Sequence, residues 1–190
     1  TAQVLLAVMA GMYAVYHGPK ELKNIATKIH QQAVRFEAIL EKFAIEQLNE
    51  NYFDTLLIKA DATRLTALAE AHEINLLAVD ADRVAIAFNE TVTEKSFAKL
   101  VGVFEEYTQQ KENLNPTGLE SKIPANQTRN SAFLTHPVFN SYHSETSLMR
   151  YIKRLERKDL ALNHSMISLG SCTMKLNAAS EMLPLSWAQW

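Results

Sequence analysis

The chain has 190 residues, of which 47% are hydrophobic, and this is enough apolar material for one domain with a sizeable core. Nineteen basic residues against twenty-one acidic residues give a net charge of -2, which argues against nucleic acid as a partner. Five widely spaced glycines exclude a G-x-G-x-x-G turn or a Walker loop, and a single cysteine, Cys172, excludes an internal disulfide and a thiolate zinc cluster.

Residues 1 to 50 carry the pattern of two helices separated by a break. Residues 1 to 16 predict one apolar helix, whose longest apolar run is too short to cross the ~30 Å hydrocarbon layer of a membrane. The sequence His17-Gly18-Pro19 then interrupts the pattern, with proline where a first helical turn tolerates it. A second helix of about thirty residues follows, because apolar residues recur at steps of three or four: Leu22, Ile25, Ile29, Ala33, Phe36, Leu40 and Phe43.

Residues 52 to 108 predict a small sheet with helices on one side. Short apolar runs mark three strands at residues 52–58, 75–79 and 83–88, the last two joined by a turn at residues 80–82. Asp61 and Thr93 are placed to cap two helices, and the apolar positions expected on their inner faces are Leu65, Leu68, Ala69, Phe97, Leu100, Val101 and Phe104. The order strand, helix, strand, strand, helix gives the fold class α/β, here a small α+β domain.

Residues 109–130 separate this domain from the rest of the chain. They are mostly polar, contain two prolines and lack periodicity, so we interpret them as a linker and as the first place where a protease would cut. Beyond them, Pro137 is expected to keep residues 133–142 extended, Ser144 to cap a helix, and residues 166–170 to form a strand. The predicted division is therefore 1–108, a linker at 109–130, and 131–190.

The spacing of the six histidines indicates no metal site. No pair has the H-x-x-x-H spacing that places two imidazoles on one helix face for zinc. His30 and His72 lie in helical patterns and are interpreted as solvated or edge-of-core residues. His136 lies in the predicted extended segment, and because loops present side chains to binding sites it is the better functional candidate.

Hydroxyl and thiol groups gather around Gly170, and Lys175 and Asn177 follow them. Donors at such a turn could bind a phosphate or a carboxylate, to which an ammonium group would add attraction. The alternative is a capped turn with a buried thiol, and the residues alone leave both open. A nucleophilic Cys172 would need a positioned base that the sequence does not identify, and Lys175 is interpreted as a surface or anion-contacting lysine rather than a Schiff-base lysine.

The string MISLGSCTMKLN at residues 166–177, together with FLTHPVFN at residues 133–140 and the helix between them, closely resembles the P-protein of the glycine cleavage system, the decarboxylating glycine dehydrogenase. Residues 131–190 carry these specific motifs, and residues 1–108 resemble the stretch that precedes them in that family. The chain also opens without methionine and ends inside an apolar stretch. We therefore expect an internal piece of a longer protein, spanning the junction of its two halves.

The resemblance implies a type I pyridoxal-phosphate, aminotransferase-like fold. Residues 1–108 would be the small domain that closes the first half, and residues 131–190 the entry arm of the second, cofactor-binding half. The family's histidine-lysine motif has no counterpart here, so the aldimine lysine and the catalytic residues are expected outside this chain, and the isolated piece is expected to be inactive. The residues placed near substrate or cofactor are His136, Ser171, Cys172, Thr173, Lys175 and Asn177.

The implied reaction belongs to glycine catabolism: an oxidoreductase uses pyridoxal phosphate to decarboxylate glycine and passes the aminomethyl group to the lipoamide of H-protein. Glycine, lipoylated H-protein and the rest of the polypeptide are the implied partners, with a homo-oligomer expected, in the cytoplasm or, in a eukaryote, the mitochondrial matrix. One alternative is a non-enzymatic, ferredoxin-like regulatory module that binds a small molecule, which would need a fourth strand soon after residue 108. Another is a structural segment whose first 49 residues pack on a partner chain.

Overall fold

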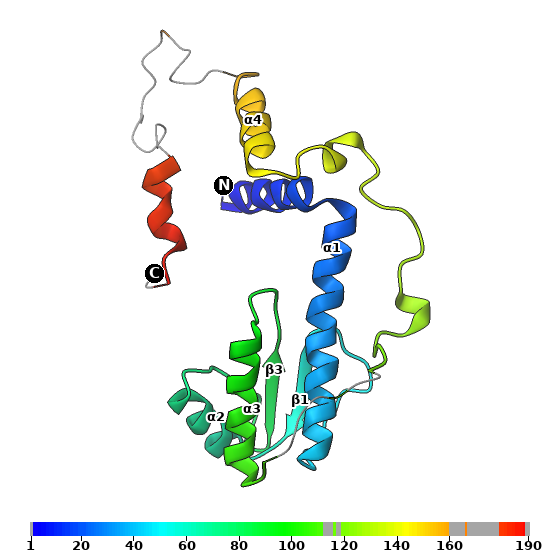
Figure 1. Ribbon diagram of the computed structural model, residues 1–190, viewed down its shortest axis with the longest axis vertical. Helices are drawn as coiled ribbons and strands as arrows, with labels where there is room; N and C mark the ends of the chain where they lie inside the picture. The colour runs from blue at the N-terminus through cyan, green and yellow to red at the C-terminus, as the bar shows by residue number, and fades with distance from the viewer. Residues whose placement is uncertain (1, 112–115, 117–118, 160–165, 167–178, 189–190) are drawn as a thin grey trace. The chain divides into compact units, whose positions relative to one another are not determined.

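The computed structural model describes residues 2–111, 116, 119–159, 166 and 179–188 (Figure 1). Two compact units make up the chain: residues 18–135 form one, and residues 1–17 together with residues 136–190 form the other. The first unit contains the sheet and the buried core, whereas the second contains short helices with largely exposed side chains.

Helix α1 (Ala2–Lys42) contains the break that the sequence predicts. Gly18 has φ 67° and ψ 176°, a non-helical conformation at positive φ that glycine adopts without a steric penalty. Pro19 follows directly, at a position where the missing N–H costs no helical hydrogen bond. The prediction of two helices that meet at residues 17–19 is therefore confirmed.

A three-stranded antiparallel sheet lies at the centre of the 18–135 unit. Strands β1 (Thr55–Lys59), β2 (Leu77–Ala78) and β3 (Arg83–Ala87) are ordered β1-β3-β2. Side chains alternate between the two faces of the sheet, and one face is buried against the helices. In Figure 1, α1 and α3 lie in front of β1 and β3. The buried positions on the two long strands are Leu56, Ile58, Val84 and Ile86.

The first strand begins three residues later than the sequence pattern predicts. The chain before Thr55 contacts α1 instead of pairing with β3: the Tyr52 hydroxyl donates to Glu37, and the Phe53 carbonyl accepts from His30. Tyr52 is therefore buried against a helix and not paired in the sheet, whereas Phe53 is 42% exposed.

Two further helices, α2 (Ala62–Ala71) and α3 (Glu94–Thr108), complete the core. Asp61 and Thr93 cap them as predicted, each accepting a backbone N–H from three residues further along. Val101 is half-buried and packs against the core, as the prediction for the inner face of α3 requires, and Val103, which the pattern does not single out, is fully buried. The buried stripe is centred near Leu100, and Val103 lies closer to that centre on the helical wheel.

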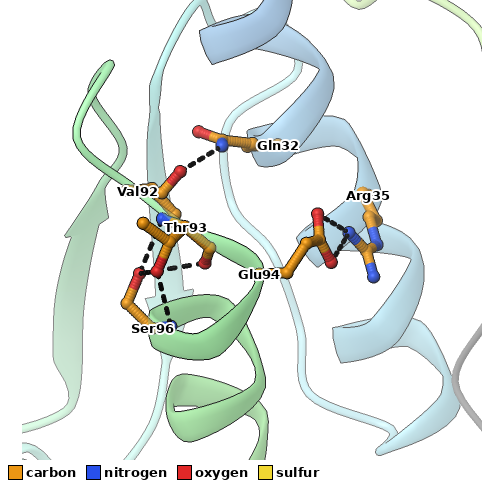
Figure 2. Close-up of polar contacts among 6 residues, drawn as sticks. All are labelled: Gln32, Arg35, Val92, Thr93, Glu94 and Ser96. Atoms are coloured by element: carbon orange, nitrogen blue, oxygen red, sulfur yellow. Dashed lines mark hydrogen bonds and ion pairs between the residues drawn. The ribbon is translucent and has the colours of Figure 1, made fainter.

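Polar contacts join α1 to the start of α3, as Figure 2 shows. The Gln32 amide donates to the Val92 carbonyl at 3.0 Å, and one Arg35 nitrogen lies 2.9 Å from both Glu94 carboxylate oxygens. The Arg35 guanidinium also lies 4.3 Å from the centre of the Phe97 ring. These contacts fix the first turn of α3 against α1 at the edge of the core.

We expect Thr93→Ala to lower the free energy of unfolding by about 1 kcal/mol. The Thr93 hydroxyl accepts from the Ser96 N–H at 3.1 Å, while the Ser96 hydroxyl accepts from the Thr93 N–H at 2.8 Å. Alanine removes the first bond and leaves a helical N–H without its cap. Thr93→Ser keeps the hydroxyl and should retain most of the stability; equal losses for the two variants in urea denaturation would contradict the capping role.

In the second unit, α4 (Glu145–Glu156) begins at Ser144, which forms a capping box with Ser147, as the sequence predicts. The expectation that residues 133–142 are wholly extended is wrong, because Pro137–Asn140 form a 3₁₀ turn, η2. Proline suits the first position of a helical turn, and so it starts this turn instead of preventing it. Two more 3₁₀ segments are η1 (Ala125–Gln127), in the 18–135 unit, and η3 (Ala179–Ser186). The predicted strand at residues 166–170 lies, except for Met166, outside the described residues.

Candidate functional site

His136 is the one predicted site residue that the structure describes. Its Nδ1 accepts the backbone N–H of Val138 at 3.1 Å, and its carbonyl accepts from the Asn140 amide. The imidazole therefore caps the η2 turn, and this hydrogen bond assigns the proton of the neutral ring to Nε2. Nε2 has no hydrogen-bond partner among the residues described, so it is available to donate to a ligand.

The other predicted site residues lie outside the described part of the chain: Ser171, Cys172, Thr173, Lys175 and Asn177. Their proximity to His136, and to any substrate or cofactor, stays a prediction.

Close to His136 in the chain, α4 and the residues before it line a cavity of about 400 Å³. Two arginines one helical turn apart, Arg150 and Arg154, lie on its wall with two tyrosine rings. We call it the arginine cavity, and its lining residues are Tyr142, Ser144, Thr146, Ser147, Arg150, Tyr151 and Arg154. The sequence pattern predicts the Ser144 cap but not this cluster.

In the 18–135 unit, a buried polar cluster connects α1 to the segment that follows α3. His30 is only 5% exposed, so of the two interpretations, solvated or at the edge of the core, the structure excludes the first. Its Nδ1 donates to the Phe53 carbonyl at 2.7 Å, and its Nε2 accepts the Lys122 N–H at 3.1 Å and lies 3.0 Å from the Ser121 hydroxyl. Because a carbonyl can only accept, the neutral ring carries its proton on Nδ1.

Glu37 lies two turns further along α1 and binds the same segment. Its carboxylate accepts from the Tyr52 hydroxyl at 2.9 Å and pairs with the Lys122 ammonium at 3.0 Å. The Glu37 side chain is 10% exposed and that of Lys122 is 40% exposed, so the ion pair reaches from the core to the surface. Residues 119–123, which we call the docked segment, are thus held to α1 through His30 and Glu37. They belong to the stretch predicted as a linker.

A signal for this cluster is present in the sequence. His30 lies three residues before Ala33 and Glu37 four residues after it, so both fall on the apolar stripe of the helix. Polar groups at such positions need partners inside the protein. The partner segment lies about ninety residues away, and no local pattern identifies it.

Next to the cluster, the docked segment and α1 enclose a cavity of about 290 Å³. Apolar groups of Val34, Phe53 and Ile123 line it, with Lys23 and Glu120 also on its wall. The buried imidazole of His30 has both nitrogens engaged and offers no free group to a ligand in the cavity. The cluster accordingly has a structural role, in which it attaches the docked segment.

Because of Tyr52, the stability that this cluster contributes should depend on pH in the alkaline range. Burial, and then the hydrogen bond to Glu37, raise the pKa of the Tyr52 phenol above its ordinary value. A group with a raised pKa in the folded state contributes stability below its unfolded pKa, near 10, and that stability is lost as the pH rises further. We expect Tyr52→Phe to lose less stability than the unmodified chain between about pH 9 and pH 11 in urea denaturation. Tyr13→Phe, at an exposed ring, is the control; equal alkaline losses in all three proteins would contradict this assignment.

No helix among the described residues is long and apolar enough to cross a membrane. Within the same residues, no three His, Cys, Asp or Glu side chains gather in a way that could hold a metal ion.

Comparison with known proteins decides the family. The family model described as "Glycine cleavage system P-protein" matches residues 1–104, more than half of the chain. The chain belongs to the glycine cleavage system P-protein family. Residues 131–190, where the sequence resemblance is most specific, lie beyond the match to the family model but within the matches to whole proteins.

Relatives in several bacteria match the chain from end to end. The glycine dehydrogenase (decarboxylating) of Christiangramia forsetii is 59% identical over 191 aligned residues, and that of Flavobacterium johnsoniae is 56% identical. The protein of the same name from Stutzerimonas stutzeri is 47% identical over 194 residues. Each match covers 100% of this chain and 20% of the relative, so the chain spans about a fifth of the length of these relatives.

Proposed function

We propose that this P-protein family chain is part of a longer glycine dehydrogenase (decarboxylating) that releases the carboxyl group of glycine. The observation that carries the proposal is 59% identity over the whole chain to a protein of that name. This identity extends over both described units and over the motif at residues 166–177. The whole protein would pass the remaining aminomethyl group to lipoylated H-protein.

The cofactor expected for this reaction is pyridoxal phosphate, which when bound supplies the electron sink for decarboxylation. Its site requires a lysine together with an Asp or Arg partner for the pyridinium nitrogen. The cavity beside α1 contains Lys23 but no Asp or Arg, and the arginine cavity contains no lysine. The described residues therefore do not fit the cofactor, and we derive no catalytic step through it. We expect its site, within a type I fold, in other parts of the longer polypeptide.

For this chain we propose two roles. The 18–135 unit serves as a structural domain, since its polar cluster is internally satisfied and attaches a segment to α1. Residues 131–190 contribute groups near the substrate: the free Nε2 of His136 supports this for the described part. For Ser171 to Asn177, the support is the chemistry of their side chains, which suits a carboxylate or a phosphate.

The ferredoxin-like regulatory module is not favoured. It would need a fourth strand after α3, but residues 119–135 of the described chain contain one 3₁₀ turn and no strand. The relatives that match the chain from end to end are also named as decarboxylating dehydrogenases.

An isotope-exchange assay tests the proposed function. The full-length polypeptide, supplied with pyridoxal phosphate and lipoylated H-protein, should exchange the carboxyl carbon of glycine with labelled bicarbonate. The 190-residue chain alone should not. Absence of exchange by the full-length polypeptide, or full exchange by the chain alone, would refute the proposal.

A further inference from the structure

We infer that the arginine cavity on α4 binds a small phosphate-bearing anion, with Arg150 and Arg154 as the groups that hold the phosphate. This inference is independent of the proposed function, because it stands on the geometry of residues 142–154 alone. The proposed function assigns no role to the residues of this cavity.

The first observation is that Arg154 is held in place. Its guanidinium donates to the Tyr142 hydroxyl and lies 5.6 Å and 5.2 Å from the centres of the Tyr142 and Tyr151 rings. The two rings are themselves stacked, with centroids 4.3 Å apart and planes at 15°. An arginine restrained in this way loses less conformational entropy when it binds an anion than a free surface arginine does.

The second observation is that Arg150 has no acidic partner among the described residues. Glu156 of the same helix pairs with Lys153 at 2.8 Å, and Glu145 does not line the cavity. Five basic residues against three acidic residues between positions 142 and 159 leave this stretch positively charged. An anion that entered the cavity would meet a guanidinium whose charge is not neutralised by the protein.

The third observation is the set of hydroxyl groups on the wall. Ser144 and Ser147 are oriented by their capping box, with the Ser144 hydroxyl donating to that of Ser147 at 2.9 Å. The Thr146 hydroxyl has no hydrogen-bond partner among the described residues and can donate to a ligand oxygen. Two guanidinium groups and a free hydroxyl provide more donors than a carboxylate can accept in one plane, and they suit the tetrahedral oxygens of a phosphate.

The volume favours an ester over the bare ion. A cavity of about 400 Å³ is within the range of small-molecule sites and leaves room beside the phosphate for an organic group against the tyrosine rings. The ligand class is therefore a phosphate monoester, and inorganic phosphate should bind more weakly through the same arginines.

Titration of the 190-residue chain with inorganic phosphate, at ionic strength held constant with sodium chloride, tests the inference. The NMR signals of the Arg150 and Arg154 side-chain Nε–Hε groups should shift in a saturable way. Arg150→Gln should weaken binding about tenfold, equivalent to ~1.4 kcal/mol. Arg150→Lys keeps the charge but loses the bidentate fork, so its affinity for phosphate should lie between that of the unmodified chain and that of Arg150→Gln. A glycerol phosphate titration should give tighter binding than inorganic phosphate.

Arg157→Gln is the matched control, because it removes the same charge from the end of α4 but lies outside the cavity. Its affinity for phosphate should stay within about twofold of the unmodified chain. Equal weakening by Arg157→Gln and Arg150→Gln would show general attraction to a basic helix and overturn the inference. Equal shifts with acetate, or shifts that do not saturate, would overturn it as well.

Discussion

Replacing Phe36 with alanine is expected to lower the free energy of unfolding by about 3–5 kcal/mol. Phe36 is fully buried on α1 and its ring contacts three others, with centroid distances of 5.2 Å to Phe104, 5.6 Å to Phe88 and 5.8 Å to Phe97. These rings come from α1, from α3 and from the residue that follows β3, so the cavity left by alanine would open where helices and sheet meet. Urea denaturation, followed by far-ultraviolet circular dichroism, measures the loss of stability.

Leu77→Ala is the control for this substitution. Leu77 lies on β2 and is 64% exposed, so its truncation should cost less than about 1 kcal/mol. Phe36→Leu keeps part of the buried volume and should give an intermediate loss. If Phe36→Ala were no more damaging than Leu77→Ala, Phe36 would not be at the centre of the core.

The second large effect is expected for Glu37→Leu, at about 2–4 kcal/mol. This substitution removes the acceptor of the buried Tyr52 hydroxyl and the partner of the Lys122 ammonium. The loss should be smaller than for a wholly buried ion pair, because Lys122 is partly exposed and can be solvated by water. Trypsin cleavage after Lys122 should also become faster, since the docked segment would be held by His30 alone.

A double-mutant cycle separates these two contributions. Tyr52→Phe removes the hydroxyl that Glu37→Leu would leave unsatisfied, so the double variant should be more stable than the sum of the two single losses predicts. Glu70→Leu, which removes a carboxylate from an exposed position on α2, is the matched control and should leave cleavage at Lys122 unchanged. Additive losses in the cycle, or unchanged cleavage in Glu37→Leu, would contradict the docking role of Glu37.

The secondary structure of the 18–135 unit could be predicted from the sequence because its signals are local. The break at Gly18, the caps at Asp61 and Thr93 and the turn at residues 80–82 each depend on neighbouring residues, and all are present in the structure. The start of β1 and the burial of Val103 depend on which other element the residues meet. Tertiary packing determines both features, and they cannot be predicted from sequence periodicity.

For the candidate site the same distinction applies. The positions of His30 and Glu37 on an apolar stripe indicate that they need partners, but Ser121 and Lys122 lie in a polar stretch without periodicity. In a similar way, the spacing of Arg150 and Arg154 places them on one side of α4, whereas the stacking of Tyr142 on Tyr151 depends on how the chain enters the helix. The family itself was recognisable because the motif at residues 166–177 is specific in its residue types and their order.

The central claim, that this chain brings substrate-proximal groups to a glycine decarboxylase, is tested most directly by the double variant Thr173→Ala, Asn177→Ala in the full-length polypeptide. We expect the rate of glycine decarboxylation with lipoylated H-protein to fall by about tenfold or more, equivalent to ~1.4 kcal/mol of transition-state stabilisation. The control pair Asn24→Ala, Thr91→Ala, at exposed positions, should keep the full rate. Melting temperatures are measured on both pairs, because a lost buried hydrogen bond can cost about 1–3 kcal/mol and imitate a catalytic defect. A tenfold loss at unchanged melting temperature would support the claim, whereas a full rate in the Thr173→Ala, Asn177→Ala variant would contradict it.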